Sequence, residues 1–350
     1  MVNKSLKVLI VIDSRSIGGI ETHVINLAIG LVNRKHQVSI VLLNYHSKHP
    51  LIRTLSRFRI PVIALDGKPW DLIKAIKNQH PDLIHTHGYK ANIIGRFAAT
   101  RTNTPCISTF HNGDMGNGKL RLYTAIDIWT SKYSTNISVS DEIAARLNDN
   151  CAAILPNFIP TKETMPGAKG RQIAFVGRLE NVKNPSLFCQ LPDLFQGDEF
   201  HVYGDGIERD QLEKNAPENL YFHGAVNDMY LRWDEIDLLI MPSLSEGLPL
   251  AALEAMSHRV PVLASKVGDL PKLIQHNING FLFDGRLSEL QSALQHWLEL
   301  DNANKNKIRH HAMKTVATHY SEDAVIPKVL TIYHAALSTS EFGASRYAIQ

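Results

Sequence analysis

Residues 237–256 read Asp-Leu-Leu-Ile-Met-Pro-Ser-Leu-Ser-Glu-Gly-Leu-Pro-Leu-Ala-Ala-Leu-Glu-Ala-Met, an apolar run, a glycine turn and a helical pattern in succession. The run 237–241 predicts a buried strand of a parallel sheet, and the apolar spacing from Leu250 to Met256 predicts a helix. Backbone N–H groups at the start of this helix are free to bind an anion such as phosphate. Glu246 before the helix and Glu254 within it suit the neutral hydroxyls of a sugar or a ribose. The alternative interpretation is an ordinary strand–turn–helix with an acid near the helix N-terminus.

The alternation of short apolar runs and helical patterns extends in both directions from this segment. Before a polar stretch at residues 161–170, the predicted strands occupy residues 7–13, 37–43, 61–65, 82–85, 105–110, 136–139 and 153–155. After it, they occupy residues 173–176, 200–203, 221–223, 238–241, 262–264 and 281–283. This pattern predicts two doubly wound parallel-sheet domains, with ligand in the cleft at the carboxyl ends of their strands. A helix is also expected at 229–235, whereas 338–350 show no periodicity and form a candidate disordered tail.

The composition of the 350-residue chain, 44% hydrophobic and 20% charged, is typical of a soluble globular protein. No apolar run approaches the roughly 20 residues of a membrane-spanning helix, and we expect no secretory signal. The three cysteines are far apart and odd in number, which predicts a reducing compartment and no metal cluster. Residues 1–168 carry 20 Lys and Arg against 11 Asp and Glu, whereas residues 169–350 carry 17 against 23. The basic first half therefore predicts an anionic surface or partner.

Several polar residues directly follow predicted strands. Arg178 and Lys183 follow the strand at 173–176, where two cations can hold a diphosphate leaving group or can simply be solvated. His111 follows the strand at 105–110, where a histidine can hydrogen-bond a sugar hydroxyl or be no more than a surface polar group. The glycine turns that follow strands contain Gly18-Gly19, Gly177, Gly204-Asp205-Gly206 and Gly247. These turns either let a phosphate approach the backbone or are merely tight turns.

His85 and His87 alternate along one predicted strand and raise the question of a metal pair. No matching acid or cysteine accompanies them, so no metal site is predicted. The chain also lacks an Asp-x-Asp pair, the usual means of holding a nucleotide sugar through a divalent ion. We therefore expect neither a metal nor another cofactor.

Together, these motifs resemble those of the retaining glycosyltransferases of the two-domain GT-B type, in the large family 4. The defining signature is a Glu, seven residues and a second Glu, which here runs from Glu246 to Glu254. The resemblance extends over nearly the whole chain, through Gly18-Gly19-Ile20-Glu21, His111, Pro156-Asn157, Gly177-Arg178-Leu179, Lys183, Gly204-Asp205-Gly206, Gly224, Val260-Pro261-Val262 and Asn279-Gly280-Phe281. None of these motifs is specific alone, but their combination is.

The resemblance implies roles for individual residues. Glu246 would contact hydroxyls of the donor sugar, Glu254 would bind the donor ribose, and His111 would lie at the reacting sugar. The diphosphate would be held by Gly19, Arg178, Lys183 and the backbone around Gly247, Leu248, Pro249 and Leu250. The expected substrate-binding set also includes Gly18, Gly177, Gly204 and Asp205. The anomeric configuration would be retained, through front-face attack in which the departing phosphate helps to deprotonate the acceptor hydroxyl.

The resemblance also implies an α/β GT-B fold, with an acceptor domain at residues 1–165, completed by a helix at 321–338, and a donor domain at 166–320. The implied enzyme moves a hexosyl or N-acetylhexosaminyl group from a UDP- or GDP-linked donor to a saccharide or lipid-linked saccharide. Lipopolysaccharide, O-antigen or capsule of the bacterial envelope would be the product class. The alternatives are an epimerase or phosphorylase on the same fold, or a non-catalytic sugar-nucleotide-binding protein. An NAD-dependent oxidoreductase would need a glycine fingerprint followed by an acid, and a nucleic-acid partner is not expected.

Residues 119–133 interleave apolar and aromatic side chains with three cations, Lys119, Arg121 and Lys132. Trp and Tyr side chains such as those in this segment favour the headgroup region of a membrane. A core helix with solvated cations is the alternative. Since each cation near anionic lipid adds about 1 kcal/mol, the basic half favours a cytoplasmic enzyme that docks peripherally on the inner face of the cytoplasmic membrane.

Overall fold

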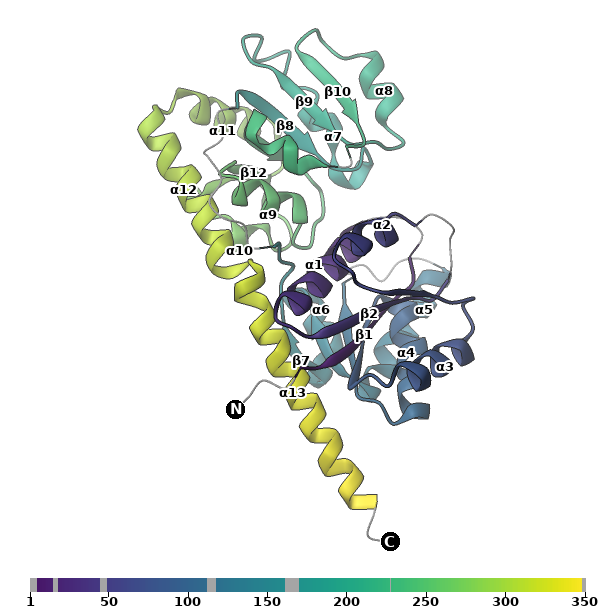
Figure 1. Ribbon diagram of the computed structural model, residues 1–350. Coiled ribbons are helices and arrows are strands. Elements are labelled where there is room, and N and C mark those ends of the chain that lie inside the picture. Colours follow the sequence, from purple (N-terminus) through teal and green to yellow (C-terminus); the bar gives the residue numbers. More distant parts are fainter. Residues whose placement is uncertain are drawn as a thin grey trace. The chain divides into compact units, whose positions relative to one another are not determined.

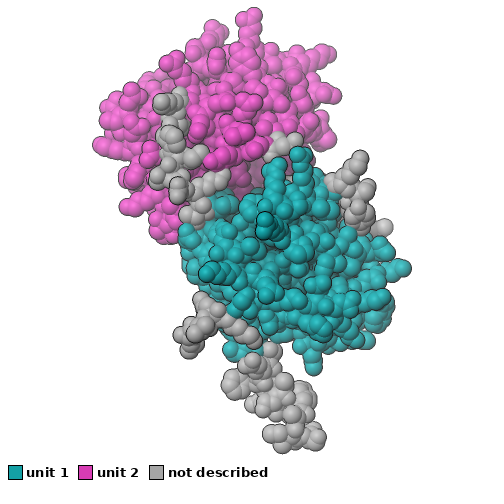
Figure 2. Space-filling model, in the orientation of Figure 1, with its two compact units in different colours: residues 1–160, 322–350 teal, residues 161–321 magenta. Residues whose placement is uncertain are grey.

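The computed structural model describes residues 5–14, 18–44, 49–111, 118–160, 170–226 and 228–347, with side chains at all of these positions except 119, 148 and 339–347. The chain forms two compact units, one of residues 1–160 and 322–350 and one of residues 161–321 (Figure 2). Each unit is built on one parallel β-sheet with helices packed against it (Figure 1). Most of the polar stretch at 161–170 lies outside the described residues.

The sheet of the first unit has seven strands in the order β3-β2-β1-β4-β5-β6-β7. The strands are β1 (Lys7–Ile12), β2 (Gln37–Leu42), β3 (Val62–Ala64), β4 (Leu83–His87), β5 (Cys106–Phe110), β6 (Thr135–Ser138) and β7 (Cys151–Ile154). The helices are α1 (Gly19–Asn33), α2 (Pro50–Arg57), α3 (Pro69–Gln79), α4 (Tyr89–Thr102), α5 (Lys119–Thr130), α6 (Asp141–Leu147) and α13 (Glu322–Tyr347), with short 3-10 turns η1 (Ser131–Tyr133) and η2 (Asn148–Asn150). The strand order reverses between β1 and β4, and ligands of open α/β sheets bind beyond the carboxyl ends of the strands at such a point.

Alternate side chains of β1 enter hydrophobic cores on opposite faces of this sheet. Val8, Ile10 and Ile12 pack with side chains of α1, α2 and α13. Leu9 and Val11 pack on the other face with side chains of α3 and α4. All five are at most 1% exposed. The continuous apolar run of this strand therefore reflects burial on both faces, as is usual in a parallel sheet.

The last helix, α13, returns to the first unit and packs against α1. Ile326 lies so close to Gly30 that a Cβ added at the glycine would come within 2.8 Å of it. Arg34 on α1 pairs with Glu322 at 2.8 Å. Because α13 continues through Tyr347, the expectation of a disordered tail from 338 onward was wrong over the described residues. A helix that is already formed can extend without an apolar stripe, since each added residue adds a backbone hydrogen bond.

The sheet of the second unit has six strands in the order β10-β9-β8-β11-β12-β13. The strands are β8 (Gln172–Val176), β9 (Phe200–Tyr203), β10 (Leu220–Gly224), β11 (Ile236–Met241), β12 (Val262–Ser265) and β13 (Gly280–Phe283). The helices are α7 (Pro185–Phe188), α8 (Arg209–Lys214), α9 (Leu250–Ser257), α10 (Leu270–Leu273), α11 (Leu287–Glu299) and α12 (Asn302–His319), and η3 (Asn181–Lys183) is a 3-10 turn. Here the order reverses between β8 and β11, so the loops that follow these two strands share the edge where ligands bind.

The predicted helix at 229–235 is instead a pair of 3-10 turns, η4 (Met229–Leu231) and η5 (Trp233–Glu235). A seven-residue segment gains few α-helical hydrogen bonds to offset the cost of nucleation. The two turns place the Trp233 side chain in the interior, where it is 1% exposed.

A buried ion pair joins α4 to α5 in the first unit. Arg96, 2% exposed, donates from Nη1 to Oδ1 of Asp127 at 2.7 Å. Asn92 donates to the second oxygen of the same carboxylate at 3.1 Å, and Arg96 Nε donates to Ser134 Oγ at 2.8 Å. Burial raises the pKa of Asp127 to about 6, although Arg96 opposes the shift. Keeping this buried carboxylate ionised at neutral pH therefore costs desolvation free energy, and the Arg96 guanidinium offsets that cost.

We expect the substitution Arg96→Leu to lower the free energy of unfolding of the first unit by about 3–5 kcal/mol, because it leaves a buried carboxylate unpaired. The loss should be smaller at pH 5 than at pH 8. Burial raises the pKa of Asp127 from 3.8 to about 6 on folding, so its contribution to stability is full below pH 3.8 and is lost as the pH rises through 6. Without Arg96, which opposes this shift, the pKa rises further, so the variant's buried carboxyl is neutral at pH 5 and carries an uncompensated charge only at higher pH.

Urea unfolding followed by circular dichroism at the two pH values measures the effect of this substitution. Arg232→Ala is the control, because that arginine forms a half-exposed pair with Glu235 and should change stability by less than about 1 kcal/mol. If Arg96→Leu lowered the free energy of unfolding no more than this control does, the ion pair would not stabilise the fold.

Candidate functional site

Glu246 lies in the loop after β11 and forms an ion pair with Lys183, which ends the turn η3 after β8. Lys183 Nζ lies 2.5 Å from Glu246 Oε1, and Ser243 Oγ donates to the same oxygen at 2.8 Å. The Glu246 side chain is only 6% exposed, so the neighbouring ammonium offsets the cost of burying its charge. Two residues predicted to act on different parts of a ligand are thus bound to each other at the point where the strand order reverses. Among the described residues, none donates to the second oxygen, Oε2.

The Glu246 loop rests on the segment that follows β12. Ser265 Oγ donates to the Ser243 carbonyl at 2.5 Å, and the Asp269 N–H donates to the Gly247 carbonyl at 3.3 Å. Gly268 has φ +54°, and a Cβ at this position would come within 1.8 Å of the Glu246 carbonyl oxygen. Only glycine permits so close an approach of the two backbones. Sequence analysis missed Gly268, although a glycine between β12 and α10 was the available signal.

Arg178 forms an ion pair of its own and does not join the Lys183–Glu246 pair. Its side chain is 68% exposed and pairs with Glu180 at 2.9 Å. Gly177, directly before it, donates to the Tyr203 carbonyl at 3.0 Å. Gly204 has φ +153°, and a Cβ there would lie 1.8 Å from the Gly177 carbonyl oxygen. Gly204 therefore allows close contact between the loops that follow the adjacent strands β8 and β9.

The remaining predicted residues of the second unit occupy different environments. Asp205 accepts from the Gly206 N–H at 2.8 Å and lies 3.5 Å from Arg209. A Cβ at Gly247 would meet no atom within 4 Å, so that position is open. Leu248 is a buried core residue. Pro249 is the N-cap of α9, and no side chain of the described residues caps the helix there. The N–H groups of Ala252 and Leu253 donate to the Pro249 carbonyl, which leaves the N–H group of Leu250 for a ligand. Glu254 lies within α9 and is half-buried.

The predicted glycine turn of the first unit, Gly18-Gly19, forms a hydrogen bond with the helix that it opens, α1. The Gly18 N–H donates to Glu21 Oε2 at 2.8 Å at the start of α1, which is one half of a capping box, because glycine has no side chain to form the other half. A Cβ at Gly19 would meet no atom within 4 Å. The Gly18 N–H is therefore already satisfied, whereas the space beside Gly19 is open.

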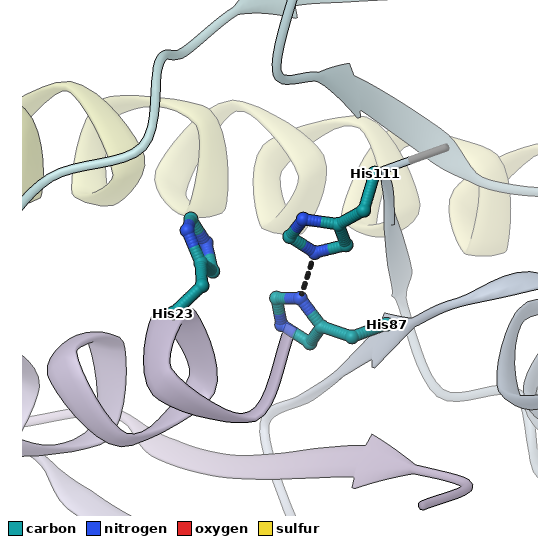
Figure 3. Close-up of side chains that lie close together, drawn as sticks. All are labelled: His23, His87 and His111. Carbon is teal, nitrogen blue, oxygen red and sulfur yellow. Dashed lines mark hydrogen bonds between the residues drawn. The ribbon is translucent and has the colours of Figure 1, made fainter. Parts of the chain in front are cut away.

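Four histidines gather at the carboxyl edge of the first sheet, next to the reversal between β1 and β4. His23 comes from α1, His87 from the end of β4 and His111 from the residue after β5 (Figure 3), and His85 also lies on β4. His87 Nδ1 and His111 Nε2 lie 3.0 Å apart and share a hydrogen bond. The ring centroids of His23 and His111 are 4.8 Å apart, and those of His85 and His87 are 4.3 Å apart. His23 was missed by sequence analysis, which paired His85 with His87.

Burial keeps these imidazoles neutral at neutral pH. It lowers the pKa of His23 to about 4 and that of His85 to about 3, and it holds the pKa values of His87 and His111 well below the usual range. Neighbouring histidines add to the shift for the last three. Neutral imidazoles can donate and accept hydrogen bonds and can act as metal ligands.

The two halves of the chain match two models of known protein families. Residues 17–163 match the model described as Glycosyltransferase Family 4, and residues 170–299 match the one described as Glycosyl transferases group 1. Among curated proteins, the chain is 29% identical to UDP-Gal:alpha-D-GlcNAc-diphosphoundecaprenol alpha-1,3-galactosyltransferase of Escherichia coli, over 61% of this chain and 65% of the relative. It is 28% identical to the O-antigen biosynthesis glycosyltransferase WbnH of Escherichia coli, over 59% of this chain and 64% of the relative. The chain thus spans just under two thirds of the length of these relatives.

Solved structures share the architecture at lower identity. The crystal structure of HepE from Anabaena in complex with UDP matches 94% of this chain and 100% of its own, with a TM-score of 0.78 and 17% identity. A likeness of this kind establishes the fold, and the predicted α/β architecture of two Rossmann-like parallel-sheet domains is confirmed.

We expect Gly268→Ala to destabilise the second unit more than the same change at Gly285. Both glycines have positive φ, +54° and +87°, so alanine is strained at either position, but only a Cβ at Gly268 meets another backbone. The additional loss should be about 1–3 kcal/mol, as for an overpacked site. Denaturant unfolding of the two variants side by side measures it. Equal stability of the two variants would show that the contact beneath Glu246 relaxes freely.

Proposed function

Because the chain belongs to the family 4, group 1 glycosyltransferases of the GT-B type, we propose that it moves a sugar from a nucleotide-diphosphate sugar to a saccharide or lipid-linked saccharide. The observation that carries this proposal is the Lys183–Glu246 pair at the point of strand-order reversal in the second unit. A carboxylate whose second oxygen has no donor among the described residues suits a sugar hydroxyl, and an adjacent ammonium suits a departing diphosphate. We assign retention of the anomeric configuration to the reaction on family resemblance.

For the donor, we propose a UDP-linked hexose or N-acetylhexosamine bound by the second unit without a metal ion. The name of the galactosyltransferase relative specifies UDP-Gal, and the Anabaena structure contains UDP, which supports this choice over GDP. Lys183, Arg178 and the uncapped start of α9 would supply the positive charge and backbone donors that a metal ion supplies elsewhere. The open position of Gly247 leaves room for a ligand to reach that backbone.

For the acceptor, we propose a lipid-linked saccharide of the bacterial envelope, bound by the first unit. The names of the two relatives specify a diphosphoundecaprenol-linked GlcNAc and O-antigen biosynthesis, respectively. His111 would orient a hydroxyl of the reacting sugars as a neutral hydrogen-bonding group, since burial keeps its pKa well below the usual range.

The exposed face of α5 and η1 supports contact with a membrane surface. Leu122 and Trp129 are 62% and 67% exposed, so these two apolar side chains lie on the surface and not in a core. Lys132 lies 5.0 Å from the centre of the Trp129 ring and 5.2 Å from that of Tyr133, so cation and aromatic rings form one patch. Among the described helices, none is both long and apolar enough to cross a membrane. We propose that this patch docks peripherally on anionic lipid.

We expect Glu246→Ala and Lys183→Ala each to lower turnover at least about tenfold, equivalent to roughly 1.4 kcal/mol of transition-state stabilisation. A thermal-shift panel of UDP- and GDP-sugars identifies the donor first, since a bound ligand raises stability by mass action. Product analysis with and without acceptor then measures transfer. Lys214→Ala, which removes an exposed cation of the same unit, is the control and should retain full activity.

Near-native turnover in either site variant, with a folded protein and an identified donor, would remove the proposed roles of Glu246 and Lys183. An epimerised nucleotide sugar formed without acceptor, or a requirement for inorganic phosphate, would indicate an epimerase or a phosphorylase instead.

We expect the protein to float with liposomes that contain anionic lipid, and to do so less at high salt, because exposed charges are screened. Trp129→Ala combined with Lys132→Ala should reduce the bound fraction, since each cation near the lipid adds about 1 kcal/mol. Trp70→Ala is the matched control, because Trp70 is a similarly exposed tryptophan, 62%, on α3 of the same unit. Docking through α5 would be contradicted if the bound fraction did not depend on lipid charge. It would also be contradicted if the Trp129/Lys132 variant and the Trp70 variant lowered the bound fraction equally.

A further inference from the structure

Three of the clustered histidines offer nitrogen atoms to one common space. His23, His87 and His111 each present a ring nitrogen, and the three atoms lie within 4.8 Å of one another (Figure 3). They come from α1, from the end of β4 and from the residue after β5, so the edge of the sheet brings them together. His23 and His87 are 6% and 1% exposed, and His111 is half-buried.

Hydrogen bonding leaves His23 with a free lone pair. Its Nδ1 lies 3.1 Å from Oδ1 of Asn157, and because an amide oxygen can only accept, Nδ1 carries the proton. Nε2 of the neutral ring is then unprotonated. An outer partner that fixes the ring in this way is the usual support of a histidine that ligates a metal.

His87 also carries a nitrogen without a partner. Its Nδ1 is occupied by the hydrogen bond to His111, but its Nε2 is buried and has no hydrogen-bond partner among the described residues. Buried polar atoms are normally paired, so an orphan one is evidence of a missing ligand. His85 shows the contrast, because Tyr333 and Thr109 hydroxyls occupy both of its nitrogens at 2.7 Å.

We propose that His23, His87 and His111 bind one transition-metal ion, Zn²⁺ in particular, through neutral imidazole nitrogens. Imidazole ligands suit Zn²⁺, Cu²⁺ and Ni²⁺, whereas Mg²⁺ and Mn²⁺ prefer oxygen ligands. Two nitrogens on a tetrahedral Zn²⁺ with bonds of about 2.0–2.1 Å lie roughly 3.3 Å apart. The three ring nitrogens lie within 4.8 Å of one another, so the rings must approach by at most about 1.5 Å to reach that spacing. Three histidines leave a fourth position open to water.

The consequence for activity rests on the proposed function, whereas the binding itself does not. His111 is the residue of the first unit that we place at the reacting sugars, and an ion on its ring removes it from that role. Zn²⁺ is therefore an inhibitor of transfer, and the metal-free protein is the active form.

Metal binding is measured on the full chain after treatment with EDTA and dialysis. We expect one Zn²⁺ per chain by elemental analysis, a rise in the unfolding temperature with Zn²⁺, and no stoichiometric binding of Mg²⁺ or Mn²⁺. Asn157→Ala should weaken Zn²⁺ affinity about 10- to 100-fold, whereas Asn157→Asp, which keeps the acceptor for His23 Nδ1, should retain it. His23→Gln should weaken affinity at least as much as Asn157→Ala.

Exposed histidines provide the control for adventitious binding. The double substitution of His310→Ala and His311→Ala removes two adjacent exposed rings of α12 in the second unit and should leave Zn²⁺ affinity unchanged. The proposal is overturned if the wild-type chain binds no Zn²⁺ stoichiometrically, if His23→Gln binds it as tightly as the wild type, or if the control loses the site. Circular dichroism of each metal-free variant establishes that it is folded.

The activity measurement is separate. EDTA should leave transfer intact, and stoichiometric Zn²⁺ should abolish most of it in the wild type, with a smaller fractional loss in Asn157→Ala. A chain that binds Zn²⁺ at these histidines but transfers no sugar from any donor would refute the proposed function and leave the metal site standing. Full transfer by the Zn²⁺-loaded chain would refute the inhibition.

Discussion

The common direction of the strands in each sheet is the constraint on which both candidate sites depend. Loops that follow parallel strands meet at one edge, and the strand order reverses there between β1 and β4 in one unit and between β8 and β11 in the other. This edge brings Lys183 to Glu246 across 63 positions of sequence. In the first unit it brings His87 to His111. Neither pair is a local motif, because each is created by strand order.

The two sites solve the problem of burying polar groups in opposite ways. In the second unit, the nearly buried carboxylate of Glu246 is compensated by Lys183, so an anionic diphosphate that approaches this ammonium competes with the carboxylate for it. In the first unit, burial of the histidines lowers their pKa values and removes the charge altogether. The second unit is therefore suited to charged ligand groups, and the first unit to neutral hydroxyls or to a metal ion that prefers neutral nitrogen.

The fold was readily predicted from the sequence because strands buried on both faces are continuous apolar runs, as in β1 and β11, separated by helical patterns. The helix expected at 229–235 failed because a short segment can bury its aromatic residue in 3-10 turns instead. The positions of Arg178, Lys183, Glu246 and His111 after strands were predicted, and their roles stay predictions. It was harder to predict which side chains contact one another. Lys183 contacts Glu246, and His87 forms its hydrogen bond with His111 and not with His85, because of which loops are neighbours at the edge of the sheet. Gly268 was missed because a glycine after a strand does not reveal which backbone it approaches, here the Glu246 carbonyl of another loop.

The histidine cluster also depends on the far end of the chain. Tyr333 on α13, fully buried, forms a hydrogen bond with His85 Nδ1 at 2.7 Å across 248 positions of sequence. Thr109 Oγ1 occupies the other nitrogen, and since a hydroxyl can either donate or accept, both tautomers of His85 are satisfied. The ring is thus fixed in place whichever nitrogen carries the proton, and it lies 4.3 Å from the ring of His87. Because α13 anchors His85 in this way, the last helix supports the histidine site as well as the hydrophobic core of the first unit.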